Sequence, residues 1–407
     1  MLQKDPMNDL AHAHAALQDQ ILQAKARSQL LSIRGLGSKD FYHPLPAHLS
    51  TLPLHTRALD GVINYEPTEL FVQVAAGTSL RQVEALLDAQ GQCLPFEPPR
   101  LRVPGQDALD KGDATIGGMV ACGLSGPARA SVGGLKDFIL GANLINGKGE
   151  HLVFGGQVMK NVAGYDVSRV LAGSMGTLGL ITEVTLKVLP KTLGECSLKT
   201  RLPLRQALAF IQGLGQRPWP LNASSFLADS ALSNASDGVE CVLRLKGAKA
   251  AAQSSLASIQ SELLAMGQHP EVMSEPQAQA HWESLRDQTH PFLTTPPHQD
   301  SSLWRISLPL KALKQGPPTF ARNALSEWFG ALHWVWADEK EARVVQKEVL
   351  GLGGTLSLWR AAKGHEDDDP PLKGLSTGVE GPVMQLQNNL QRAFDPGGVF
   401  NTARTQP

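Results

Sequence analysis

The chain has 407 residues, 42% of them hydrophobic and 18% charged, with 37 Lys and Arg against 38 Asp and Glu. This apolar content excludes wholesale disorder, and the balanced charge argues against nucleic acid as a partner. The length predicts two or three domains. The cysteines are far apart and have no C-x-x-C spacing, so we expect reduced thiols and no metal site or iron–sulfur cluster. They are Cys93, Cys122, Cys196 and Cys241.

Targeting signals are not evident. Residues 1–29 carry charges and lack the apolar core of a secretory signal, and no stretch reaches 18 apolar residues. We therefore expect a cytoplasmic protein that reaches the inner face of the cytoplasmic membrane only through partners.

The first predicted elements have the order α-β-β-β-β-α, which favours an α+β domain over a βαβ repeat. An amphipathic helix is expected over residues 9–29. A second helix begins at Ser79, where Gln82 completes a capping box and Gly91 follows the last turn. The strands between them are expected over residues 30–34, 50–55, 62–65 and 71–75.

Glycine becomes frequent between residues 93 and 179. Two strands, 138–145 and 151–154, flank a hairpin turn at residues 146–149. A short helix over 166–171 and a strand over 180–189 complete this domain.

The composition changes after about residue 195, where a second α+β domain is predicted. Its strands are expected over 242–245, 303–308 and 332–336, and its helices over 248–266 and 338–350. The acidic run at residues 366–369 reads as a solvated loop. A last helix is expected over residues 380–396.

Four glycine clusters within the first domain are the main functional signal. Any one of them could be a turn, but together they suit a long ligand with a pyrophosphate, because glycine lets backbone N–H groups approach an anion. The first is not a dinucleotide fingerprint, since Asp40 stands where G-x-G-x-x-G needs its last glycine, and no Walker A loop exists. The clusters cover residues 34–39, 114–119, 123–126 and 173–179.

The string from Lys160 to Asp166 (KNVAGYD) is also unusual. It is either a loop whose Asn and Asp cap a helix, or a loop that lies against a flat cofactor.

Several long strings resemble the FAD-binding subunit of bacterial glycolate oxidase, within the superfamily of vanillyl-alcohol oxidase and D-lactate dehydrogenase. The resemblance is dense over residues 30–190 and thinner beyond. It implies a two-subdomain PCMH-type FAD-binding domain (1–194), a smaller α+β cap domain (195–379) and a C-terminal segment (380–407) that returns to the first domain. The strings are 63–70, 94–99, 118–127, 154–166, 303–309 and 394–401.

The resemblance also implies which residues contact FAD. The pyrophosphate loop is expected at Gly35, Leu36, Gly37, Ser38 and Lys39. The flavin side is expected at Thr115, Gly117, Gly118, Gly123 and Ser125, and the adenosine and ribose side at Ser174, Gly176, Thr177 and Ile181. Asn161, Gly164 and Tyr165 are also expected to face the cofactor. Many relatives attach FAD through a His or Cys in the first loop; here the nearest histidine is His43, so noncovalent FAD is expected.

Oxidation of a 2-hydroxy acid needs a cation for the carboxylate and a base for the hydroxyl proton. The cap domain lacks the His-rich string of related dehydrogenases, its histidines are scattered, and the catalytic residues stay unknown. Arg286, with His290 as a base, and Arg305 are weak candidates for such a site.

Three hypotheses therefore remain open for the role of the chain. It is the second flavoprotein of a glycolate oxidase complex, beside a D-lactate dehydrogenase-like FAD subunit and an iron–sulfur subunit. Alternatively, it is a self-sufficient dehydrogenase for a small 2-hydroxy acid. The third possibility is a scaffold that no longer binds FAD.

Overall fold

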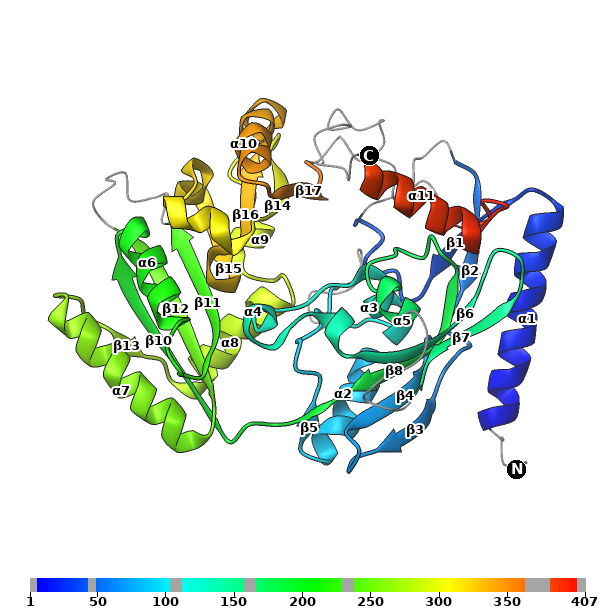
Figure 1. Cartoon of the computed structure of the whole chain (residues 1–407), viewed down its shortest axis with the longest axis horizontal. Helices are drawn as coiled ribbons and strands as arrows, with labels where there is room; N and C mark the ends of the chain where they lie inside the picture. Colours follow the sequence, from blue (N-terminus) through cyan, green and yellow to red (C-terminus); the bar gives the residue numbers. More distant parts are fainter. Residues whose placement is uncertain are drawn as a thin grey trace. The chain divides into compact units, whose positions relative to one another are not determined.

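A computed structural model describes residues 6–42, 49–102, 112–156, 166–228, 238–362 and 381–400. The chain divides into two units, each of which mixes helices and strands, so the predicted α+β class is confirmed (Figure 1). The first unit contains residues 1–125, 134–191 and 379–406, and the second contains 126–133 and 192–378.

The first unit is built on a five-stranded antiparallel sheet. Its strands alternate or run continuously in apolar residues, which is why the sequence pattern located all five of them. In sheet order they are β3 (Val62–Glu66), β4 (Phe71–Ala75), β8 (Leu180–Lys187), β6 (Ile139–Ile145) and β7 (His151–Gly155).

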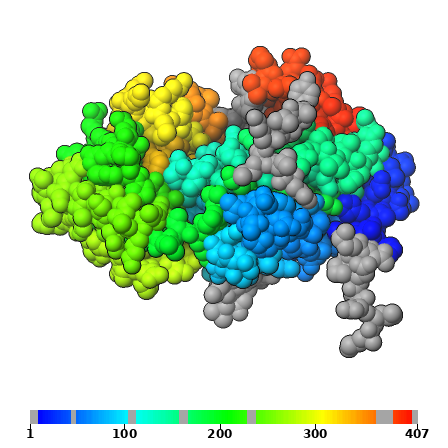
Figure 2. Space-filling model, turned by 60° about the horizontal axis from the view of Figure 1, so that its bottom comes forward, coloured from blue at the N-terminus to red at the C-terminus, as the bar shows by residue number. Residues whose placement is uncertain are grey.

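Two helices pack on one face of this sheet. In α2 (Leu80–Ala89), Val83 and Leu87 lie one turn apart and are fully buried, and α3 (Ile116–Cys122) adds Met119 to the same core. The predicted start of α2 is confirmed, because the Ser79 side chain accepts a hydrogen bond from the Gln82 N–H. Figure 2 shows the outer surface of this region, from β3 to α2, as a continuous blue area.

A second core of this unit joins the first helix to the last described residues. Leu17 and Ile21 of α1 (Pro6–Ala26) pack with Leu54 and Phe400 around the parallel pair β1 (Leu30–Arg34) and β2 (Thr51–His55). The Leu31 N–H donates to the Val399 carbonyl over 2.7 Å. α1 ends three residues before the predicted boundary, and Ser28 beyond it has a φ of +51°. Smaller elements are β5 (Gln92–Cys93), η1 (Leu135–Asp137), α5 (Val167–Val170), β9 (Leu189–Pro190) and α11 (Pro382–Phe394).

The second unit contains one eight-stranded antiparallel sheet. The sequence pattern located three of its strands, and β10 begins at Gly194, one residue before the predicted start of this domain. In sheet order the strands are β13 (Glu271–Val272), β10 (Gly194–Leu202), β12 (Val239–Gly247), β11 (Leu221–Ala228), β15 (Ala324–Glu327), β16 (Leu332–Ala337), β14 (Ser302–Ser307) and β17 (Thr355–Arg360).

Two apolar clusters bury residues of the second sheet against its helices. The first includes Leu243 and Phe226 with Ile211 of α6, and the second includes Ile306 with Val349 of α10. The alternate residues of the strands are more polar, and Arg244, Ser225 and Glu327 among them are buried. The helical elements are α4 (Arg129–Val132), α6 (Leu204–Leu214), α7 (Lys249–Ala265), α8 (Glu275–Arg286), α9 (Pro291–Thr294), η2 (Leu310–Gln315), η3 (Thr319–Asn323), η4 (Trp328–Gly330) and α10 (Glu339–Gly351).

The segment 126–133, with α4, leaves the first unit and belongs to the second. The Ser131 hydroxyl donates to the Asn222 carbonyl over 2.7 Å, and the Trp328 indole N–H donates to the Gly126 carbonyl over 3.0 Å. The Arg129 guanidinium lies 4.5 Å from the centre of the Trp328 ring. No local pattern in the sequence predicts this excursion of the chain.

Candidate cofactor-binding site

A cleft in the first unit collects residues from the ends of several elements. It encloses about 700 Å³, counting the space open to solvent. Its walls come from the loop after β1, the residues after β2 and β4, helix α3 and the turn before β8. They are residues 33–40, Thr56, Ala76, Thr115, Gly117, Gly118, Ala121, Cys122, Met175, Gly176, Gly179 and Ile181.

The loop from Gly35 to Lys39 has backbone N–H groups available to a ligand. Within the described part of the chain, none of these five N–H groups donates a hydrogen bond, although Gly37 and Ser38 are buried. Buried backbone N–H groups are nearly always paired with another group. An ion pair between Arg34 and Asp40 closes the ends of the loop. The loop therefore has the donors of an anion site, and Asp40 is part of its closure.

Thr115 holds the opposite wall of the cleft in place. It is the N-cap of α3, its side chain accepts from the Gly118 N–H over 3.2 Å, and it is 3% exposed. A Cβ at Gly35 would lie 2.3 Å from the Thr115 Oγ1, so glycine is needed at 35 for the loop and α3 to approach each other.

The backbone N–H groups at the start of α3 are already used. The Ile116 N–H donates to the Thr78 carbonyl over 2.9 Å, and the Gly117 N–H donates to the Ala76 carbonyl over 2.7 Å. A Cβ at Gly117 would meet the Ala76 Cβ at 2.8 Å. Gly117 and Gly118 line the cleft, but they present surface to a ligand and not N–H donors.

The turn before β8 forms the third wall. Gly176 has a φ of +77° and lines the cleft with Ile181. Ser174 and Thr177 do not line it; the Thr177 hydroxyl donates to the Ser174 carbonyl over 2.7 Å, so this pair closes the turn itself. The Met175 N–H donates to the Ala121 carbonyl, which fixes the turn against α3.

Gly123 and Ser125 do not line the cleft either, contrary to the sequence prediction. Gly123 is the C-cap of α3 with a φ of +63°, and a Cβ there would lie 2.8 Å from the Gly173 nitrogen. The Ser125 hydroxyl accepts from the Leu135 N–H over 3.1 Å at the base of the excursion to α4. Asn161, Gly164, Tyr165 and His43 lie outside the described residues.

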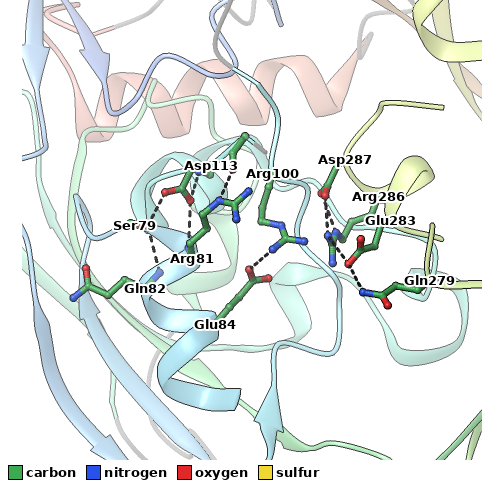
Figure 3. Close-up of polar contacts among 12 residues, drawn as sticks. Ser79, Arg81, Gln82, Glu84, Arg100, Asp113, Gln279, Glu283, Arg286 and Asp287 are labelled. Atoms are coloured by element: carbon green, nitrogen blue, oxygen red, sulfur yellow. Dashed lines mark hydrogen bonds and ion pairs between the residues drawn. The ribbon is translucent and has the colours of Figure 1, made fainter. Parts of the chain in front are cut away.

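Lys39 is the partly buried cation of the cleft. Burial lowers its pKa below the ordinary value, while the nearby Cys122 and Asp113 act in the opposite direction. Asp113 itself accepts from the Ser79 hydroxyl over 2.6 Å and from the Arg81 N–H over 3.2 Å, and these contacts fix the segment that leads to Thr115 (Figure 3).

Several lining residues were not predicted from the sequence. Thr56 and Ala76 directly follow β2 and β4, so the rule that ligands meet strand ends could have indicated them. Cys122 carries the thiol of the cleft, and it lies at the last turn of a helix whose N-cap was predicted. Met175 has a φ of +53°, which nothing in its residue type indicates.

Arg286, proposed from the sequence to clamp a carboxylate, already binds one. Its Nε and Nη2 donate to the two carboxylate oxygens of Asp287 over 2.9 and 2.7 Å, and Glu283 lies 3.7 Å away (Figure 3). A substrate carboxylate would have to displace a bidentate ion pair. The geometry disfavours Arg286 as a substrate ligand.

Arg305 lies in β14 of the second unit among aromatic rings. Its guanidinium is 5.4 Å from the centre of the Trp328 ring and 5.9 Å from that of Trp334. The Trp334 indole N–H donates to Glu327 over 2.8 Å, so this ring is held in place.

Two histidines that appeared scattered in the sequence lie together in the second unit. The rings of His281 and His290 are 6.1 Å apart, and the His281 Nε2 is 2.9 Å from the Ser225 hydroxyl. Burial lowers both pKa values, that of His281 to about 4. The His290 Nδ1 accepts from the Phe292 N–H and caps α9, so His290 has a structural contact at this nitrogen.

Neither a metal site nor a membrane span is found in the described ranges. No group of three or more His, Cys, Asp or Glu residues there could hold a metal ion. No described helix is long and apolar enough to cross a bilayer.

The fold and the cleft define an FAD-binding domain. Residues 10–155 match the FAD_binding_4 family, described as an FAD binding domain. Two crystal structures of alkyldihydroxyacetonephosphate synthase share the fold, both with a TM-score of 0.62, at 15% and 13% identity; they cover 94% and 95% of this chain and 73% and 74% of theirs. The predicted PCMH-type architecture and the FAD cofactor are confirmed.

The chain belongs to the family of the glycolate oxidase subunit GlcE, as the sequence resemblance predicted. It is 35% identical to GlcE of Escherichia coli K12 over 389 residues, which cover 96% of both chains. Shorter matches are glycolate oxidase subunit GlcD of Bacillus subtilis 168 (26% over 140 residues, 34% of this chain and 28% of GlcD) and a D-lactate dehydrogenase of Anaerostipes hadrus (31% over 132 residues, 32% and 26%). The chain is thus related to oxidoreductases over its whole length.

Proposed function

We propose that this chain is the second FAD-carrying subunit of a multi-subunit glycolate oxidase, which converts glycolate to glyoxylate. The observation that carries the FAD site is the loop from Gly35 to Lys39, whose five backbone N–H groups donate to no described residue, in a cleft of the matched domain. The similarity to GlcE along the whole chain supports the assignment to the complex.

In this proposal the Gly35–Lys39 loop binds the pyrophosphate through its N–H groups. Thr115, Gly117 and Gly118 form one wall against the cofactor, and Gly176 with Ile181 form another. Ser174 and Thr177 support the turn that carries Gly176. Asn161, Gly164 and Tyr165, which lie outside the described residues, complete the set inferred from the family, whereas Gly123 and Ser125 support the end of α3 and the chain after it. Bound FAD supplies hydride and electron acceptance, and the chain's residues hold and orient it.

The cofactor is bound noncovalently in this proposal, because the loop has neither His nor Cys. Cys122 is a cysteine that lines the cleft. Acid precipitation tests the point: FAD should remain in the supernatant, and flavin that stays with the precipitated chain but not with Cys122→Ser would identify a covalent bond.

A relay or assembly role fits this chain better than independent catalysis. Arg286 is held by Asp287, and the partly buried His281 and His290 contact Ser225 and Phe292. We infer that the hydride step takes place on a companion FAD subunit that resembles D-lactate dehydrogenase. An iron–sulfur subunit would carry the electrons on, so that this chain would meet the membrane only through its partner subunits.

The test begins with the chain purified alone under anaerobic conditions. A flavin band near 450 nm that stays oxidised when glycolate is added, and bleaches once the companion subunits are present, supports the relay role. Bleaching by the chain alone would establish a self-sufficient 2-hydroxy acid dehydrogenase. A folded chain without a flavin band would support the third hypothesis, a scaffold that no longer binds FAD.

A further inference from the structure

The charged groups around the cleft differ in the partners that they already have. Arg34 is paired with Asp40, and both are more than a third exposed. Asp113 accepts three hydrogen bonds, from the Ser79 hydroxyl and from the N–H groups of Arg81 and Ala114. Lys39 lines the cleft at the end of the loop whose N–H groups have no partner among the described residues, and the groups that act on its charge are Asp113 and Cys122. An anion in this cleft would meet one ammonium group that burial has already partly desolvated.

Backbone N–H groups and an ammonium group stabilise a bound diphosphate in different ways. The N–H groups of the Gly35–Lys39 loop supply hydrogen bonds but no net charge, so two phosphate charges held by them alone stay uncompensated. An ammonium group on the same loop supplies the missing positive charge. Partial burial strengthens its attraction to a phosphate, because the local dielectric constant is lower than in water.

We propose that Lys39 is the cationic ligand of the FAD pyrophosphate, and that its amino group takes up a proton when FAD binds. This inference rests on the proposed function only in that FAD occupies the cleft. It makes Lys39 a residue that discriminates FAD from flavins without the pyrophosphate.

The pH dependence follows from linkage. Burial lowers the pKa of Lys39 in the chain without FAD, and the negative pyrophosphate would raise it in the complex. Binding therefore takes up a proton at any pH between the two values, and FAD affinity falls there by up to about tenfold per pH unit. Cys122 and Asp113 face the same amino group, and the Arg34–Asp40 pair lies at the loop ends, so their variants are needed as controls.

The experiment uses the full chain from which FAD has been removed. Flavin fluorescence quenching gives the dissociation constants of FAD and riboflavin from pH 7 to 10, and calorimetry in two buffers of different ionisation enthalpy gives the protons taken up. Lys39→Met is expected to weaken FAD binding about 10–100-fold at pH 7, to leave riboflavin binding unchanged, and to abolish proton uptake.

Lys39→Arg separates charge from structure, because arginine stays protonated throughout this range. It should bind FAD with an affinity independent of pH and without proton uptake. Lys148→Met, at an exposed turn of the same unit, is the matched control, and Cys122→Ser tests whether the thiol titrates instead. Equal FAD affinity in Lys39→Met and the wild type would overturn the inference. A wild-type chain that binds no FAD would overturn the proposed function itself.

Discussion

Substitution of Gly35 by alanine adds a single methyl group at the point where the cleft should tolerate it least. A Cβ there would lie 2.3 Å from the Thr115 Oγ1 and 2.9 Å from its Cγ2. Ordinary contact needs about 3.4 Å, so either the loop or Thr115 must move by about 1 Å. Thr115 is buried and caps α3, so it has little room. Overpacking of this kind costs about 1–3 kcal/mol, and loss of the cap costs a further 0.5–2 kcal/mol or so.

The expected effect of Gly35→Ala is therefore a loss of about 2–4 kcal/mol from the stability of the first unit, with weaker FAD binding because the loop moves. The two units can be followed separately. All seven tryptophans lie between residues 219 and 359, so intrinsic fluorescence reports the second unit, and release of bound flavin reports the first.

A double-mutant cycle isolates the contact. Thr115→Ala removes both crowded atoms and leaves only the Cβ at 3.1 Å, so Gly35→Ala should cost less in that background, with a coupling of about 0.5–3 kcal/mol. Gly213→Ala is the control, because Gly213 lies in α6 with open space around it, and alanine there should stabilise the helix by up to about 1 kcal/mol. Wild-type flavin release and affinity in Gly35→Ala would refute the reasoning.

Three further outcomes follow from single groups. Burial lowers the pKa of His333 to about 4. The folded chain therefore keeps this histidine neutral, and the free energy of unfolding should fall by about 3 kcal/mol as the pH drops from above 6.5 to 4. Unfolding followed by tryptophan fluorescence should depend less steeply on acid pH in His333→Asn. Asp395→Ala should cost about 1–3 kcal/mol for each of the buried N–H groups of Val399 and Phe400 that it leaves unpaired, and faster hydrogen exchange at Leu31 should accompany the loss. Arg286→Gln should leave glycolate-driven flavin reduction in the assembled complex unchanged, and a rise in KM would contradict its pairing with Asp287.

The sequence was sufficient for the elements whose local pattern and packing agree. The five strands of the first sheet and the Ser79 cap were predicted because apolar alternation and side-chain capping are encoded within a few residues. β11 was missed because Asn222, Ser224 and Ser225 are polar, yet all three are buried. Their partners, such as Ser131, lie far away in the chain, so no local pattern could predict this strand.

The glycine clusters show a different limit. A glycine in the sequence does not tell whether its missing side chain makes room for a ligand or for the chain itself. Gly37 and Gly123 were both predicted to contact FAD, but their surroundings differ. Gly37 belongs to the loop whose N–H groups donate to no described residue, whereas Gly123 ends α3 against the backbone of Gly173.

This difference predicts which property each glycine controls. Both have a positive φ, so alanine is strained by about 1–2 kcal/mol at either position. At Gly37 the added Cβ meets the Arg34 guanidinium, an exposed and flexible group that can move aside, so Gly37→Ala should weaken FAD binding more than folding. At Gly123 it meets backbone atoms that cannot move independently, so Gly123→Ala should lower the unfolding temperature before it affects affinity. If flavin affinity fell more in Gly123→Ala, at unchanged stability, the cofactor would reach further along α3 than the described cleft.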